Sequence, residues 1–400
     1  MVFVGWYAAS ILWAEDKMYA LQYCAYVVLA TLTVLYTTQI CRSPSRLTAA
    51  FKLVFLLISV EIFLSALEGL GLIRLPFSPY SQYYAYFGRE PEDLSGFGVW
   101  ASEYIASLPT GFFSNPNNLA AFLALALPFF ALHQKWLVRI VATSAILYIV
   151  YMCGARSVLV ACGLTLTICV FVWGGIAGRF GGLMTASLVV TIVGAGTLDL
   201  VSGSSNTRIL ELEGLGGAIG DFWASLRGDA VLVDSSTGAR AQLIRNGLDA
   251  LYDSGGLGVG AGGSWVIQEK SLFQVREITS MHNFWIELLV EGGVLFALLF
   301  AAWYARFLVQ LWKVAKSSRS PERRYLAKSL FAGFAGFIIG AIGPSTVIYM
   351  LPMWMLVGIG LSVIMLDSGE SEIADSAKSS HRRPVERLAM AGRTALPRFN

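Results

Sequence analysis

The chain passes from a polar segment into an apolar helix over Met281-His-Asn-Phe-Trp-Ile-Glu-Leu-Leu-Val-Glu-Gly-Gly293. His282 stands at this junction, whereas the other two histidines of the sequence lie in basic segments elsewhere. Glu287 and Glu291 follow four residues apart, which places them on one face of a helix. A titratable imidazole at a water–lipid boundary beside two carboxylates is a candidate functional site. Whether these groups act together depends on the topology of the helices around them.

The composition is that of a helical membrane protein. Hydrophobic residues make up 56% of the 400 residues and charged residues 14%, against about 45–50% and about 25% in soluble chains. The apolar residues recur in runs near the roughly 20 residues that a membrane-spanning helix needs. A net charge of +3, spread over loops, argues against nucleic acid as a partner. None of the five cysteines has CxxC spacing, so neither a disulfide framework nor a zinc site is expected.

We expect an all-α integral membrane protein with about ten transmembrane helices. The predicted spans are residues 1–14, 18–40, 49–72, 117–134, 136–153, 157–175, 182–201, 284–312, 329–347 and 350–366. Two stretches, 73–116 and 202–283, are too long and polar to be simple turns, and short amphipathic helices are expected in them. The membrane domain is therefore predicted over residues 1–366, followed by a disordered cytoplasmic tail over 367–400.

Lysine and arginine set the predicted orientation. The segment 313–328 is dense in both, which places it on the cytoplasmic side. Counting spans in both directions from this segment places both termini in the cytoplasm. The two long loops and His282 then face the opposite side of the membrane.

Outward-facing arginines are candidates for binding an anion. Arg156 stands in the tight turn Gly154-Ala-Arg-Ser157, where it either extends to lipid headgroups or grips a phosphate with its planar guanidinium. Arg240 and Arg245 lie on residues 240–252, whose leucine spacing predicts an amphipathic helix on the membrane or on the bundle. These two arginines belong either to a solvated helix face or to a polar cavity.

The segment Gly111-Phe-Phe-Ser-Asn-Pro-Asn-Asn118 opens the predicted fourth span. Asn115 as the N-cap with Pro116 at the first helical position is ordinary helix-start chemistry. Asn117 and Asn118 are not explained in this way, because amides at membrane depth need partners from a polar cavity or a sugar hydroxyl. The tyrosines of the preceding loop are expected as interfacial anchors rather than as platforms for sugars.

Glycines and carboxylates complete the candidate features. Gly258, Gly260 and Gly263 have G-x-G-x-x-G spacing, but no strand precedes them, so a tight crossing of the backbone is predicted instead of a dinucleotide site. Glu61 lies within a span, where a carboxylate is either functional or structural. Glu287 lies in the first turn of its helix and is favoured by the helix dipole. Glu291 precedes two glycines, which indicates close packing or a buried hydrogen bond.

Taken in order, these motifs resemble the O-antigen ligase and polymerase family. The shared elements are Gly111-x-Phe-x-Asn-Pro-Asn-x-Leu-Ala120, Ala155-Arg-Ser157, Arg240 ahead of Gly258-x-Gly260, and His282-Asn283 with Glu291-x-Gly293. The resemblance covers roughly residues 110–300. The His-Asn…Glu-x-Gly block is its most specific part.

The resemblance implies a GT-C-like glycosyltransferase of the bacterial cytoplasmic membrane, with its active site facing the periplasm or exterior. Its partners would be an undecaprenyl-diphosphate-linked glycan donor, a glycan or lipid acceptor and membrane lipids, with no nucleotide, metal or other cofactor. His282 would be the catalytic residue that activates or orients the acceptor hydroxyl. The donor diphosphate would be bound by Arg156, Arg240 and Arg245. The supporting residues would be Asn283, Glu291, Asn115 and Asn117.

Two other functions remain open at this point. A polysaccharide polymerase that joins carrier-linked repeat units would carry the same motifs. A lipid-linked sugar transporter or flippase would place polar groups near the membrane midplane. In this sequence the suggestive polar residues gather at the outer boundary instead, which disfavours transport.

Overall fold

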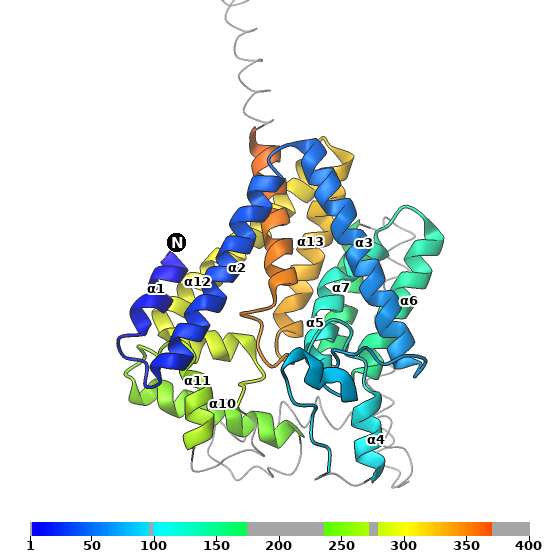
Figure 1. The fold of residues 1–400 in the computed structure, drawn as a ribbon. Helices are drawn as coiled ribbons and strands as arrows, with labels where there is room; N and C mark the ends of the chain where they lie inside the picture. The colour runs from blue at the N-terminus through cyan, green and yellow to red at the C-terminus, as the bar shows by residue number, and fades with distance from the viewer. Residues whose placement is uncertain (1, 96–98, 174–235, 272–278, 370–400) are drawn as a thin grey trace, which may run out of the picture.

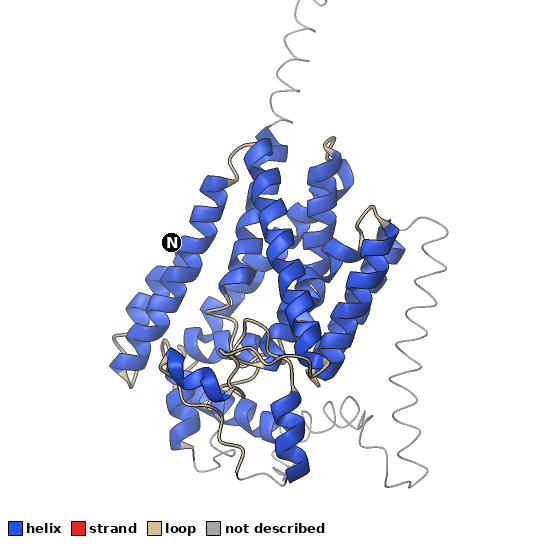
Figure 2. Ribbon diagram, turned by 45° about the vertical axis from the view of Figure 1, so that its right-hand side comes forward, coloured by secondary structure: helices blue, strands red, loops and turns tan. Residues whose placement is uncertain are grey.

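The computed structural model describes residues 2–95, 99–173, 236–271 and 279–369 (Figure 1). Every regular element in these ranges is a helix, so the predicted all-α class is confirmed (Figure 2). The predicted span 182–201 lies outside the described residues. The same holds for residues 202–235 of the predicted outer loop and for nearly all of the predicted tail.

A bundle of long helices forms the body of the molecule. Its members are α2 (Lys17–Ile40), α3 (Pro44–Gly69), α5 (Pro116–Ala131), α6 (Trp136–Met152), α7 (Arg156–Trp173), α12 (Phe284–Ser317), α13 (Pro321–Gly340) and the final helix Leu351–Gly369. Five helices in the described part of the chain are long and apolar enough to cross a membrane: α2, α3, α7, α12 and the final helix. The multi-pass membrane protein expected from the composition is therefore supported by the structure.

The starts of these helices follow from local sequence. Ser43 accepts a hydrogen bond from the backbone N–H of Arg46 and is followed by Pro44 at the first helical position. Ser320 does the same for Arg323 ahead of Pro321. A serine cap satisfies one of the unpaired N–H groups of the first turn, and proline has no N–H to leave unpaired there.

The smaller helices gather at one end of the bundle, where α5, α7 and α12 begin (Figure 1). They are η1 (Gln82–Phe87), α4 (Val99–Ser107), α10 (Ser236–Asp253) and α11 (Gly263–Lys270), while α1 (Val2–Ser10) packs beside α2 and α12. The amphipathic helix predicted over 240–252 is confirmed as α10, which buries Leu243 and Leu251 and rests on α11 and α12. The connections α2–α3 and α12–α13 lie at the opposite end.

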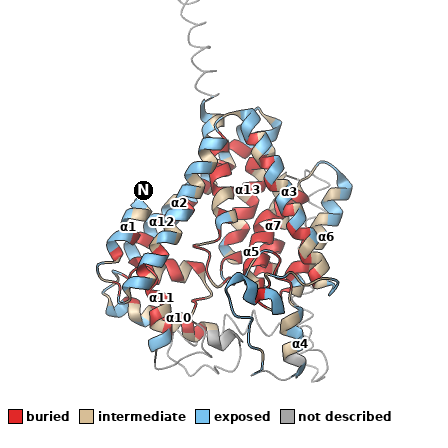
Figure 3. Ribbon diagram, in the orientation of Figure 1, coloured by how far each residue is buried: buried red, intermediate tan, exposed pale blue. Residues whose placement is uncertain are grey.

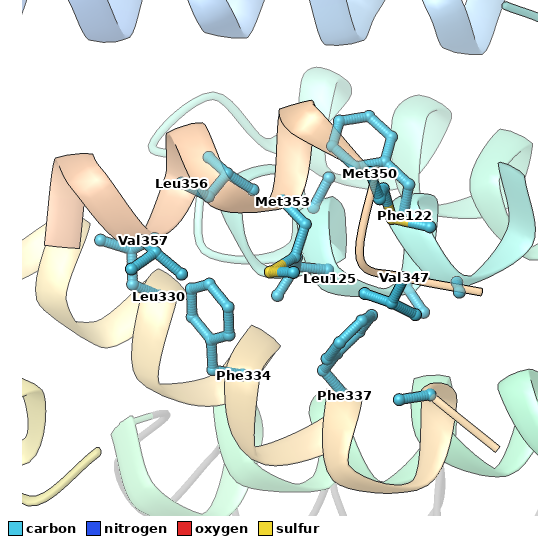
Figure 4. Close-up of a cluster of buried hydrophobic side chains, with 14 of the residues drawn as sticks. Phe122, Leu125, Leu330, Phe334, Phe337, Val347, Met350, Met353, Leu356 and Val357 are labelled. Carbon is cyan, nitrogen blue, oxygen red and sulfur yellow. The ribbon is translucent and has the colours of Figure 1, made fainter. Parts of the chain in front are cut away.

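The core is built around α13, which packs against α5, α7 and α12. Phe122 and Leu125 of α5 meet Phe334 and Phe337 of α13 and Met353 of the final helix (Figure 4). Buried residues follow these central helices, whereas the outer faces of α2 and α3 are exposed (Figure 3). Apolar residues on those outer faces are what a lipid-facing surface requires.

Glycines let neighbouring helices approach α13 closely. A Cβ atom at Gly333 would lie 2.3 Å from the carbonyl oxygen of Leu125, and one at Gly336 would lie 1.9 Å from Thr165 Oγ1. Close approach of small residues is a main source of helix association in membranes. Larger residues at these two positions would separate α13 from α5 and α7.

The predicted span 329–347 is wrong at its C-terminal end. α13 begins at Pro321 and ends at Gly340, and residues 341–350 form a non-helical connection to the final helix. Pro344 follows Gly343 in this connection and has no N–H to donate to a helix. The backbone N–H of Phe284 donates to the carbonyl of Ala341 at 3.0 Å, so the connection is attached to the start of α12.

Candidate functional site

His282 occupies the turn that starts α12. Among the described residues it is the only non-glycine residue with positive φ, at 46°. Asn283 is the N-cap that follows it, and its Oδ1 accepts hydrogen bonds from the N–H groups of Trp285 (3.1 Å) and Ile286 (3.4 Å). The cap fixes where the helix begins and thereby holds His282 at its edge.

The ring of His282 is oriented by the 341–350 connection. Its Nδ1 lies 3.5 Å from the carbonyl oxygen of Gly343. Because a carbonyl can only accept, the neutral ring that makes this bond carries its proton on Nδ1. Nε2 is then the nitrogen that can accept a proton.

Two arginines act electrostatically on this region. Burial, and then the charge of Arg240, lower the pKa of His282 to about 4, while its contact with Gly343 acts in the opposite direction. Burial, and then the charge of Arg156, lower the pKa of Arg240. No carboxylate of the described chain is among the causes of either shift. The charge of Arg240 thus acts on a neutral His282 imidazole, and Arg156 acts in turn on Arg240, so the three side chains belong to one electropositive region that suits an anion.

The 341–350 connection joins the starts of three helices at this point. The backbone N–H and hydroxyl of Ser345 donate to Asn118 Oδ1 of α5, at 3.1 and 3.4 Å. A Cβ atom at Gly343 would lie 2.9 Å from Ser157 Oγ of α7. Together with the His282 contact, these interactions tie α5, α7 and α12 to one loop.

The other predicted residues lie around this centre in different roles. Asn115 caps α5 by accepting from the N–H of Asn117 at 2.8 Å. Of the two amides expected to need hydrogen-bond partners, Asn118 is buried, whereas the side chain of Asn117 is partly exposed. Arg245 follows Arg240 by five positions on α10, which turns its side chain about 140° around the helix. The geometry of α10 thus separates Arg245 from Arg240.

Glu291 and Glu287 are both buried on α12. Glu291 accepts hydrogen bonds from the hydroxyls of Ser264 (2.6 Å) and Tyr7 (3.3 Å), which attaches α11 and α1 to α12. Of the two alternatives inferred from sequence for Glu291, close packing or a buried hydrogen bond, the buried hydrogen bond is present. Glu287 accepts from the hydroxyl of Tyr23 at 3.4 Å and is 1% exposed, so it contacts α2 as well as lying in the first turn of its helix.

The glycine segment packs on an interruption in α12. Gly293 has φ 80° and ψ 174°, which breaks the helix and frees several carbonyl groups. These carbonyls accept hydrogen bonds from outside the helix: Val290 from Val259 N (2.9 Å), Glu291 from Gly260 N (3.1 Å) and Gly292 from Trp6 Nε1 (2.8 Å). A Cβ atom at Gly258 would lie 2.5 Å from Gly293 N. The predicted tight crossing is confirmed, and what the backbone approaches is α12 itself.

Two carboxylates of α3 hold the segment that leads into α5. The carboxylate of Glu61 accepts from the N–H of Phe112 at 3.2 Å and from the hydroxyl of Ser65 at 3.2 Å. Glu68 accepts from the N–H groups of Thr110 (2.9 Å) and Gly111 (2.8 Å). Glu61 therefore has a structural partner, on a segment about fifty positions further along the chain.

Sequence reasoning missed the 341–350 connection and Tyr104. A Cβ atom at Gly154 would lie 3.4 Å from the hydroxyl of Tyr104, and the charge of Arg156 acts on that tyrosine. The available signal for the connection was Gly343-Pro-Ser-Thr346, a group of small polar residues and a proline between two apolar runs. No comparable signal marks Tyr104.

Comparison with known proteins finds a family model that matches the same region. Residues 141–301 match the family model described as O-antigen ligase. The teichuronic acid biosynthesis protein TuaE of Bacillus subtilis (strain 168) is 21% identical over 275 residues, which are 66% of this chain and 53% of TuaE. The chain thus spans about half the length of this curated relative.

The O-antigen ligase match contains Arg156, Arg240 and His282. It runs from α6 through α7, α10 and α11 into α12. The 341–350 connection lies beyond residues 141–301, so the family match includes neither Gly343 nor Ser345. Their contacts with the site are seen in the structure alone.

Proposed function

We propose that this protein is an O-antigen ligase-like glycosyltransferase of the bacterial cytoplasmic membrane. It transfers a glycan from an undecaprenyl-diphosphate carrier to an acceptor hydroxyl. The observation that carries the proposal is the convergence of Arg156, Arg240 and His282 at the helix starts of a membrane bundle. The family match and the similarity to TuaE support a ligase- or polymerase-type role in polysaccharide biosynthesis.

The chemistry assigns a role to each of these three side chains. The acceptor oxygen bonds to the anomeric carbon of the donor sugar, and the bond from that carbon to the phosphate oxygen breaks. The leaving diphosphate takes the electron pair, and the guanidinium groups of Arg156 and Arg240 stabilise its charge. Nε2 of His282 takes the hydroxyl proton, which requires the neutral imidazole that the lowered pKa provides.

The remaining predicted residues keep the parts in position. Asn115 and Asn283 cap the helices that lead away from the site. Glu291 fixes α11 and α1 on α12 beneath it. Arg245 is an accessory cation of the outer region, and the end that carries all of these residues faces the periplasm or exterior.

The arginine roles are tested by transfer assays on the protein in nanodiscs with a carrier-linked glycan. We expect Arg156→Gln and Arg240→Gln each to lower transfer by about 100-fold or more, because each removes a donor aimed at the developing charge. Arg139→Gln is the matched control and should transfer normally, because Arg139 is exposed and lies in the first turn of α6, a helix that starts at the opposite end of the bundle. Undiminished transfer by both site variants would remove the basis of the proposal.

The acceptor is tested in the same system. Carrier-linked glycan is supplied alone or with a lipid A-core acceptor, and the products are separated by mass. Transfer to the lipid acceptor identifies a ligase. Growth of chains on the carrier in its absence identifies a polymerase of the same chemistry.

A further inference from the structure

A cavity lies between α2, α11 and the 341–350 connection. Its volume is about 410 Å³, within the range of about 300–1,000 Å³ usual for ligand pockets. Five of the residues that line it are aromatic: Tyr19, Tyr23, Tyr26, Trp265 and Tyr349. None of them is among Arg156, Arg240 and His282, the three side chains proposed to act in the reaction.

The aromatic rings of this cavity meet edge to face. Tyr26 and Tyr349 have ring centroids 5.3 Å apart at 64°, and Tyr23 and Tyr26 are 5.7 Å apart at 61°. Edge-to-face contact leaves a ring face that the partner ring does not cover. The hydroxyl of Tyr26 accepts from Gln22 Nε2 at 2.6 Å, so polar groups stand at the ring edges. Apolar faces with polar edges match a sugar ring, which has C–H groups on its face and hydroxyls at its rim.

One charge distinguishes the cavity from a neutral sugar site. Among the described residues that line it, Arg89 is the only charged one. Its Nη1 donates to the hydroxyl of Tyr84 at 3.2 Å, and no carboxylate in the described ranges lies within ion-pair distance of it. A guanidinium binds a carboxylate with two parallel hydrogen bonds. The cavity therefore offers aromatic faces and one cation without a carboxylate partner.

The cavity and the candidate site share structural elements. Tyr349 belongs to the 341–350 connection, whose Gly343 contacts the His282 ring. Ser114 lines the cavity and immediately precedes Asn115, the cap of α5. A saccharide in the cavity would thus contact the same connection that orients the His282 ring.

We propose that this cavity binds an acidic saccharide unit of a glycan substrate, with Tyr26 and Tyr349 against its ring and Arg89 on its carboxylate. The inference rests on the proposed function only for the statement that the saccharide belongs to a substrate. It makes Arg89 a residue that selects acidic over neutral sugars.

The test measures binding to the full chain in nanodiscs of zwitterionic lipid. The probes are a hyaluronan tetrasaccharide, which carries glucuronic acid, and the same tetrasaccharide with its carboxylates reduced to alcohols. We expect the acidic probe to bind about tenfold more tightly, the effect of one charge-assisted pair. Arg89→Gln should remove this preference, and Arg139→Gln should retain it.

The aromatic contribution is tested with the same two probes. Tyr26→Ala should weaken binding of both, because it removes the ring face. Tyr36→Ala is the matched control, since Tyr36 lies on the same helix, is 72% exposed and does not line the cavity. Equal affinity for the two probes, an unchanged preference in Arg89→Gln, or no binding of either probe would overturn the inference.

Failure of this inference can be separated from failure of the proposed function. His282→Ala should lose transfer and keep the preference for the acidic probe. If it transfers normally while Arg89→Gln loses the preference, the catalytic assignment fails and the cavity stands. If it loses transfer while Arg89→Gln keeps the preference, the cavity assignment fails alone.

Discussion

At the scale of single residues, His282 combines an unusual backbone conformation with the role proposed for it in transfer. Its φ of 46° lies in the left-handed region, which asparagine tolerates and which costs alanine about 1 kcal/mol. We expect His282→Asn to keep the protein's Tm and lose glycan transfer, because it retains the turn and removes the proton acceptor. His282→Ala should lose transfer and also melt slightly earlier. Wild-type transfer by the asparagine variant would exclude the imidazole from the reaction.

The pKa of His282 predicts a pH profile. Because burial and Arg240 lower it from 6.5 to about 4, the ring stays neutral as the pH falls through 6.5. We expect kcat/KM for transfer to be flat across that range and to decline only on approach to pH 4. In Arg240→Gln one of the two causes is removed, so the decline should move to higher pH. A decline centred at 6.5 in the wild-type protein would contradict this.

The same shift affects stability with a defined sign. The unfolded chain protonates His282 near pH 6.5 and the folded chain near pH 4, so the unfolded state binds more protons between these values. The contribution of this residue to stability is complete above pH 6.5. It is lost as the pH falls towards 4.

Gly111 offers a test of the carboxylate anchors of α3. A Cβ atom there would lie 1.8 Å from Glu61 Oε1 and 2.5 Å from Ser65 Oγ, and φ is 53°. Gly88 has a similar φ of 71° but nothing within 4 Å, so Gly88→Ala measures the backbone strain alone. We expect Gly111→Ala to cost at least about 1–3 kcal/mol more than Gly88→Ala, because it adds overpacking. Equal Tm values for the two variants would show that the Glu61 contact is dispensable.

At the scale of elements, the interruption of α12 depends on donors from other parts of the chain. Trp6→Phe keeps the ring that stacks on Phe296 and removes the indole N–H that binds the Gly292 carbonyl. We expect a loss of about 1–3 kcal/mol, the cost of leaving a part-buried carbonyl unpaired. Phe3→Leu alters packing on the same Phe296 without removing a donor and serves as the comparison. The measurement is the Tm of the purified protein.

An element can be predicted from sequence when the residues that determine it lie close together in the chain. The leucine spacing of α10 and the Asn115-Pro116 start of α5 are contained within a few residues, and both predictions agree with the structure. The 341–350 connection was merged into spans because valine, isoleucine and methionine surround its Gly-Pro-Ser. Hydropathy averaged over a span cannot register one proline and a few small polar residues.

The candidate site likewise has features that the local sequence indicates and features that it does not. The sequence indicates Arg156, Arg240 and His282 because ionisable groups at a predicted membrane boundary are unusual. The contacts that arrange the site, such as Asn118 with Ser345, join residues more than two hundred positions apart. Neither residue type nor spacing carries information about such pairs, so they required the structure.

At the scale of the whole molecule, the two ends of the bundle differ in character. One end carries the candidate site. At the other end, Asp367 Oδ1 accepts a hydrogen bond from Ser318 Oγ at 2.5 Å and lies 3.5 Å from Arg323 Nε. The lysines and arginines of the α12–α13 connection lie at that second end. The orientation predicted from these charges, with that end in the cytoplasm, stays a prediction.

Cysteine labelling tests the orientation. Ser95 and Ser317 are both exposed and lie towards opposite ends, whereas four of the five native cysteines are buried. We expect a membrane-impermeant maleimide to label Ser95→Cys in intact spheroplasts and Ser317→Cys only after lysis. The unsubstituted protein measures the background. The reverse pattern would place the site on the cytoplasmic side and contradict the predicted orientation.

The interruption at Gly293 also constrains the order in which the chain is built. A hydrocarbon environment does not tolerate the unpaired carbonyls of residues 290–292, and their donors come from Trp6, Val259 and Gly260. All three donors precede α12 in the sequence, so the ribosome has made them before this helix enters the membrane. During biogenesis the interrupted helix can therefore insert next to hydrogen-bond donors that have already been synthesised. In a circular permutant that begins at α12, these donors would not yet be synthesised when α12 enters the membrane. The helix would then have to stay continuous at Gly293 until the donors had been made.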